Sequence, residues 1–215
     1  MSLKPALSTL RLGAVASACL AIAGAAGAFE TAITPGSRTL FLQVGAGSMS
    51  GGTFNNGGSP VNNALVNTAT VTVPAAQLGS GSALPMLTDS TVTQSPYDNF
   101  AFCDSPATTG EIYVGGYYRT PGTAAAASLT VTTPPALINE RGNTLPFTQI
   151  AWSSTGNNDN SQAIGDGTFT GSTQTLRAVS RNTWFESCMR FRYLNSAIVP
   201  AGTFTGQARF TLTAP

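Results

Sequence analysis

The segment from Arg181 to Ser196, RNTWFESCMRFRYLNS, gathers several side chains whose types could support chemistry. It holds one carboxylate, Glu186, one cysteine, Cys188, and three arginines, together with Trp184. A carboxylate can transfer protons and a cysteine thiolate can act as a nucleophile, so this spacing first suggests an active site. Whether it is one depends on the partners available and on the elements that position these side chains.

The partners that such catalysis needs are missing. The chain has no histidine, and its single lysine is Lys4, so triads built on histidine and Schiff-base chemistry are excluded. The glycine-rich segment GAGSMSGG (45–52) lacks the Lys-Ser/Thr ending of a phosphate-binding loop. Carboxylate pairs of the glycosidase type need no histidine, but no pair stands out among the candidate acids. These are Asp98, Asp104, Glu111, Asp159, Asp166 and Glu186. We therefore predict no catalytic residues, no cofactor and no enzymatic activity.

The first 28 residues have the pattern of a secretory signal peptide. Lys4 and Arg11 precede an apolar run over 12–25, and Ala26-Gly27-Ala28 offers small residues at a cleavage site. A transmembrane helix is the alternative, but the run is shorter than the ~20 residues needed to span a membrane. Lipidation of Cys19 is a second alternative, with a poor signal around it. We expect a mature chain from about Phe29, without a membrane span, in the periplasm, at the cell surface or outside the cell.

The mature chain carries few charges. Removal of Lys4 and Arg11 leaves eight arginines against nine acidic residues, which is too few cations to neutralise a run of phosphates. Nucleic acid is therefore not an expected partner. Residues 29–215 are long enough for one domain with its own core, and we expect a single domain.

Two cysteines remain after processing, Cys103 and Cys188. In an oxidising compartment such a pair predicts a disulfide. Closing a loop of this length restricts the unfolded chain by about 4.5 kcal/mol in the chain-entropy model. A sulfur in a disulfide has no thiolate, so the pairing removes Cys188 as a candidate nucleophile.

Alternation with period two dominates the chain from Arg38 onward, and glycine, proline and asparagine clusters separate the alternating windows. Eight to ten short strands in one domain predict an all-β fold, an antiparallel sandwich of immunoglobulin-like or jelly-roll-like type. The windows are RTLFLQVG (38–45), TATVTVP (68–74), STVTQ (90–94), DNFAFC (98–103), EIYVGGYY (111–118), SLTVTTPP (128–135), FTQIAW (147–152), QTLRAVS (174–180), residues 181–194 and the closing GTFTGQARFTLTAP (202–215).

Alternation also assigns the two faces of the segment 181–194. Phe185, Met189, Phe191 and Tyr193 share one face, which we expect in the core. Trp184, Glu186, Arg190 and Arg192 share the other face with Cys188, and we expect them to form an exposed contact surface. The disulfide should then lie outside the main core, and the charged side chains should find partners across strands.

Two binding functions remain as alternatives. Asp159 and Asp166 lie in the oxygen-rich segment 157–166, which could bind Ca²⁺, but turns rich in Asn and Asp explain it more simply, and we assign no metal. Aromatic side chains on a sandwich could stack on sugar rings, as in a lectin-like module. The candidates are Tyr113, Tyr117, Tyr118, Trp152, Trp184 and Tyr193, of which we expect Trp152 to be buried.

The signal peptide, the strand RTLFLQVG, the single cysteine pair and the closing GTFTGQARFTLTAP together resemble secreted proteobacterial β-sandwich proteins of the pilin and spore-coat U type. The resemblance covers the last ninety or so residues best. It implies an exported immunoglobulin-like sandwich that assembles by strand exchange. The late positions of Cys103 and Cys188 depart from the pilin pattern, in which the cysteines bracket the first strands.

We therefore expect a non-enzymatic structural or adhesive subunit, fimbria-like, that assembles through strand edges. The candidate assembly strand is Thr39 to Val44, with Leu40, Leu42 and Val44 facing inward. The expected partners are further copies, related surface subunits and a periplasmic chaperone. The alternative is a soluble carbohydrate-binding module.

Overall fold

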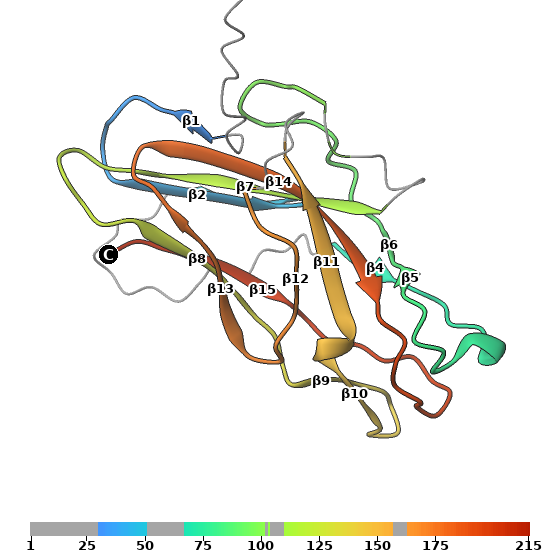
Figure 1. Ribbon diagram of the computed structural model, residues 1–215. Coiled ribbons are helices and arrows are strands. Elements are labelled where there is room, and N and C mark those ends of the chain that lie inside the picture. The colour runs from blue at the N-terminus through green and yellow to red at the C-terminus, as the bar shows by residue number, and fades with distance from the viewer. Residues whose placement is uncertain (1–29, 51–66, 102, 104–109, 157–162) are drawn as a thin grey trace, which may run out of the picture.

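The computed structural model describes residues 30–50, 67–101, 103, 110–156 and 163–215 and consists almost entirely of strands (Figure 1). The expected signal peptide, residues 1–28, lies outside this part of the chain. The helices within the described ranges are the 3-10 turns η1 (Ala75–Gln77) and η2 (Phe147–Gln149). No helix there is long and apolar enough to cross a membrane. The predicted all-β antiparallel sandwich is confirmed.

The larger of the two main sheets has eight strands, and the long strand β14 (Thr183–Tyr193) lies at its centre. The continuous path runs β12 (Gly167–Thr168), β11 (Ile150–Thr155), β14, β7 (Glu111–Arg119), β2 (Thr39–Val44) and β3 (Gly47–Ser50). The short strands β1 (Glu30–Ala32) and β5 (Leu84–Pro85) also pair with β14. All of these pairings are antiparallel.

The smaller sheet has three strands and lies below the large one in Figure 1. Its order is β13 (Thr173–Val179), β8 (Ala127–Thr132) and β15 (Arg209–Thr213). Two further pairs stand apart: β9 (Ala136–Ile138) with β10 (Thr144–Pro146), and β4 (Ala69–Thr70) with β6 (Leu87–Thr88). The chain therefore forms two unequal layers.

The main core lies between these layers. From the large sheet, the residues that alternation placed inward on β14 all belong to it, and Phe185 and Met189 have no exposed surface. From the small sheet, Leu129 and Val131 of β8 are fully buried against them. Trp152 of β11 is 2% exposed and belongs to the same cluster, as expected. The prediction that the odd-numbered apolar residues of β14 face the core is confirmed.

Candidate functional site

The outer face of β14, turned away from the small sheet, is buried along much of its length. Trp184 is 5% exposed and Glu186 is not exposed at all, whereas Arg190 is half-buried and Arg192 is exposed. The expectation of an exposed contact surface is therefore wrong for Trp184 and Glu186. At the other end of this predicted contact surface, the side chains of Arg190 and Arg192 do reach solvent.

A segment ahead of β7 covers this face, and its residues 90–101 and 103 are called the outer segment below. In Figure 1 this green chain passes over β7 and β14 on the side opposite β8. Ser95 and Asn99 hold it in a tight turn, because the Ser95 amide donates to the Phe100 carbonyl and the Asn99 amide donates to the Ser95 carbonyl. Asn99 has φ 63°, a left-handed conformation that asparagine tolerates. The outer segment is why the second face of β14 is buried.

The carboxylate of Glu186 joins the outer segment to the sheet. Its Oε2 atom accepts hydrogen bonds from the Ser95 hydroxyl at 2.7 Å, the Tyr113 hydroxyl at 2.9 Å and the Trp184 indole nitrogen at 3.0 Å. Ser95 Oγ also accepts from the Tyr97 amide. A buried carboxylate is tolerated only when donors replace water, and these three donors do so. Losing any one donor would leave the charge less well compensated.

Tyr113 reaches this carboxylate across Gly115 of the same strand. A Cβ at Gly115 would lie 2.2 Å from the Tyr113 hydroxyl, so only glycine leaves the ring room to lie over the strand. Burial, together with the nearby negative charge of Glu186, raises the pKa of Tyr113 well above its ordinary value. Tyr113 therefore remains a protonated donor over the whole physiological range.

Four aromatic rings gather beside the network, and they are called the outer aromatic cluster below: Phe41, Tyr97, Tyr117 and Trp184. Phe41, Tyr117 and Trp184 lie directly opposite one another on β2, β7 and β14, while Tyr97 comes from the outer segment. Ring centroids of the contacting pairs are 5.3 to 5.8 Å apart, with interplanar angles of 20° to 34°. Tyr97 is 44% exposed and covers the buried Trp184. The cluster thus has a covered base and an accessible aromatic top.

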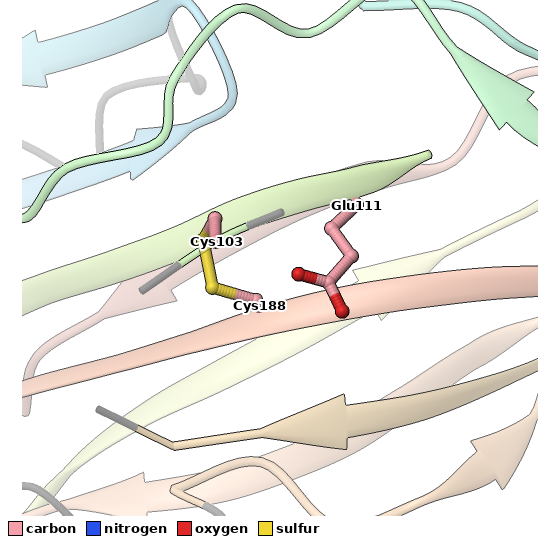
Figure 2. A group of neighbouring side chains, drawn as sticks. All are labelled: Cys103, Glu111 and Cys188. Atoms are coloured by element: carbon pink, nitrogen blue, oxygen red, sulfur yellow. A yellow bond between two sulfur atoms is a disulfide. The ribbon is translucent and has the colours of Figure 1, made fainter. Parts of the chain in front are cut away.

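The predicted disulfide between Cys103 and Cys188 is present, with the two Cα atoms 5.4 Å apart. The two cysteines pack with Tyr113 and Val92 in a small cluster separate from the main core, so the placement outside the core is confirmed. Figure 2 shows the disulfide beside the carboxylate of Glu111. Their potential ligand atoms lie within 4.8 Å of one another, but sulfurs bonded to each other offer no thiolate to a metal. This group is a covalent anchor for the outer segment.

Glu111 has a different partner. The Arg190 guanidinium lies 2.9 Å from its Oε1 atom, and the side chain of Glu111 is only 3% exposed. The pair joins β7 to β14, as expected for charges that find partners across strands rather than along one strand. Arg190 is thereby committed to the sheet, and Arg192 is the exposed cation at this end of the predicted contact surface.

The candidate assembly strand lies inside the large sheet. Leu42 is 5% exposed in the main core, and Leu40 and Val44 pack against it half-buried, so their inward orientation is confirmed. However, β2 pairs with β7 along one edge and with β3 along the other. A strand with both edges paired is not free to be donated, which corrects the expectation for Thr39 to Val44.

The edges of the smaller sheet differ from each other. Along β13 the register shifts between Thr175 and Arg177, a bulge of the kind that protects an edge. Along β15 the pairing with β8 is regular from Arg209 to Thr213, and β8 is its only strand partner in the described part of the chain. Within the described residues, the outer edge of β15 therefore has no strand partner.

The remaining sequence candidates give two further results. Of the aromatic residues proposed for sugar stacking, Tyr113, Tyr118, Trp152 and Tyr193 are at most 4% exposed and cannot form a platform. Asp159 lies outside the described residues, and Asp166 accepts a hydrogen bond from the Ser154 amide of β11. The calcium alternative for 157–166 gains no support from the described part of this segment.

Sequence reasoning missed Phe41, Ser95 and Tyr97 as members of this site. One available signal was the predicted disulfide itself, because a Cys188 on the outer face requires the chain near Cys103 to cross that face. Gly115 and Gly116 were a second signal, since glycines within a strand often mark a close approach by another group.

Comparisons with protein-family models, curated proteins and solved structures found no match to this chain.

Proposed function

We propose that this chain is an exported, non-enzymatic structural or adhesive subunit, and that its copies associate through strand edges. The observation that carries the proposal is the outer edge of β15, which pairs with no strand in the described part of the chain. An edge strand presents unpaired amide and carbonyl groups that a second chain can extend. The disulfide fits an oxidising compartment such as the periplasm or the cell surface.

The apolar surface near β15 supports association at this edge. Phe210 of β15 and Leu40 and Val44 of β2 pack against the main core but remain half-buried. β15 and β2 also lie close together across the two layers. A strand added beside β15 would remove part of this apolar surface from water, which favours association.

A second copy of the same chain fits this edge. If two β15 strands pair antiparallel about Thr211, Phe210 lies opposite Leu212 of the other copy, and apolar residues meet on the core face. Arg209 then lies opposite Thr213 of the other copy, so no like charges meet. Such an edge is self-complementary, as a two-fold symmetric interface requires.

This mode differs from exchange of the β2 strand, since β2 stays paired within its own sheet. A related surface subunit or a chaperone with a free strand could occupy the same edge during export. In this proposal two copies form a closed dimer through β15. The surfaces of the dimer away from this interface would then make the adhesive contacts.

The test uses opposite charges at one exposed position. In the proposed register, Thr213 of each copy lies opposite Arg209 of the other copy, so the interface contains two such pairs. Thr213→Lys should weaken the dimer and Thr213→Glu should strengthen it, each by roughly two- to thirty-fold for two cross-strand charge pairs. The chain purified after export would be studied by sedimentation equilibrium at low and high salt, and both effects should shrink at high salt.

Thr175→Lys provides the matched control. Thr175 and Thr211 flank Thr130 in one row across the small sheet, but Thr175 lies on the β13 edge. This substitution should leave dimerisation unchanged. A wild-type chain that stays monomeric at high concentration, or Lys and Glu at position 213 acting in the same direction, would refute assembly through β15.

A further inference from the structure

We propose that the outer aromatic cluster is a binding site for neutral polysaccharides, a function independent of assembly through β15. The cluster combines Phe41, Tyr117 and Trp184 in one row across three strands with Tyr97 above them. The rings are inclined to one another by no more than 34° in the contacting pairs. They therefore stack on one another in similar orientations, and Tyr97 carries the most exposed ring of the four.

Part of this surface is open to a ligand. Tyr97 is 44% exposed and Phe100, in the same turn, is 42% exposed, while Phe41 and Tyr117 are half-buried. Two of the five large apolar side chains that are exposed in the described structure thus lie in this one turn. Tyrosine combines an apolar ring face with a hydroxyl group, which suits a ligand that is apolar on its faces and polar at its edges.

A pyranose ring with equatorial hydroxyls has this distribution. Its C–H groups make flat apolar faces that stack on aromatic rings, and its hydroxyls project at the rim. Thr39 and Gln43 share the face of Phe41 on β2 by alternation, and together with the tyrosine hydroxyls of the cluster they offer polar groups to such a rim. The chemistry fits β-linked glucans and chitin better than a peptide.

The charges near the cluster favour a neutral ligand. The Arg119 guanidinium donates to the Thr39 hydroxyl at 3.2 Å, and the Asp98 carboxylate accepts from the Phe100 amide at 2.9 Å. In the described residues, this cation lies two positions from Tyr117 on β7 and this anion lies next to Tyr97, and each already has a partner. An acidic polysaccharide would meet no surplus of positive charge here.

The site is also held rigid before any ligand arrives. Glu186 fixes both the Trp184 indole and, through Ser95, the turn that carries Tyr97. The disulfide anchors the end of the same segment at Cys103. A surface that is ordered in advance loses less conformational entropy on binding. The buried carboxylate of Glu186 thus has a structural role, which is to hold the aromatic rings in place for the ligand.

The direct test measures co-sedimentation of the purified exported chain with microcrystalline cellulose and with chitin, followed by titration with cellohexaose and chitohexaose. Trp184 lies beneath the site and Trp152, the second tryptophan, lies in the main core. Binding should therefore change the tryptophan fluorescence, because Trp184 contacts Tyr97 directly beneath the ligand.

Ring-deletion variants identify the surface. Tyr97→Ala and Tyr117→Ala should each weaken binding about tenfold, the loss expected when one stacking ring is removed. Tyr97→Phe keeps the ring and should retain most of the affinity. The control Ile198→Ala removes an apolar side chain that is 82% exposed elsewhere and should bind as the wild type does.

Two outcomes would overturn the proposal: no binding to either polysaccharide, or binding that Tyr97→Ala and Tyr117→Ala leave unchanged. Circular dichroism and dimerisation of each variant separate a lost site from a lost fold. Because dimerisation is measured on the same samples, failure of the saccharide site and failure of strand-edge assembly can be told apart.

Discussion

The two faces of β14 are both buried, but by different means. The inner face packs Phe185 and Met189 against the small sheet, and its stability comes from apolar contact over a large area. The outer face packs Trp184 and Glu186 under a single irregular segment fixed by hydrogen bonds and a disulfide. The comparison shows that a thin covering layer can bury a charged residue only when it supplies specific donors to replace water.

The first prediction measures the inner face. Phe185 has no exposed surface and lies within the main core, so Phe185→Ala leaves a cavity that the two sheets cannot easily close. We expect the free energy of unfolding to fall by about 3 to 5 kcal/mol, measured by urea denaturation followed by circular dichroism. Thr183→Ala, on the same face but half-buried at the strand end, is the control and should cost less than about 1 kcal/mol. Equal losses for the two variants would contradict the assignment of the core.

The second prediction removes the covalent anchor of the outer face. The double variant Cys103→Ala/Cys188→Ala should lower the free energy of unfolding by about 2 to 4 kcal/mol, since the disulfide closes a sequence separation of 85 residues.

In the folded state, removing the disulfide should loosen the outer segment and leave the two sheets unchanged. Proteolysis within residues 90–103 should accelerate, whereas amide exchange in β8 and β15 should change only with the global stability. Wild-type protein treated with a reductant under mild denaturation should behave like the double variant. Uniform acceleration of exchange in both sheets would mean that the outer layer and the core unfold as one unit.

The difference between the faces also explains what the sequence could predict. The inner face was predictable because β2, β7, β8 and β14 repeat an apolar residue at every second position; β2 and β14 fall within the predicted windows, and β7 and β8 each exceed their window by one residue. Burial on that side follows from alternation alone, without knowledge of the partner sheet.

The outer face was not predictable in the same way. STVTQ and DNFAFC alternate as strands do, yet their described residues form the outer segment and belong to no named strand, with an isolated bridge between Gln94 and Ala101. Pro96 between these windows and the left-handed Asn99 turn the chain instead. Alternation records which side chains share a face, and it cannot show that an irregular segment returns to cover the other one.

Element boundaries failed for similar local reasons. FTQIAW was expected to be one strand, but its first three residues form η2 after Pro146, and β11 begins at Ile150. The closing window gives a strand only from Arg209. Strands of two or three residues, such as β1 and β12, contain too few positions for any period to be recognised.

The third prediction, the smallest, tests the polar layer through pH. Tyr113→Phe removes one donor to Glu186 and should lower the free energy of unfolding at pH 8 by about 1 to 2 kcal/mol. In the folded wild type the pKa of Tyr113 is raised by burial and by Glu186, whereas in the unfolded chain it is near 10.0. Above pH 10 the unfolded chain therefore binds fewer protons than the folded one, and stability falls as the pH rises.

The Tyr113→Phe variant has no phenol to ionise at this position. Its free energy of unfolding therefore lacks this part of the decrease at alkaline pH. The difference in the free energy of unfolding between wild type and Tyr113→Phe should thus narrow by about 1.4 kcal/mol between pH 8 and pH 11. Urea denaturation across this range measures it, and the raised pKa of Tyr193 affects both proteins equally and cancels. A gap that stays constant to pH 11 would mean that Tyr113 ionises in the folded state as it does in water, and that the outer layer does not exclude solvent from Glu186.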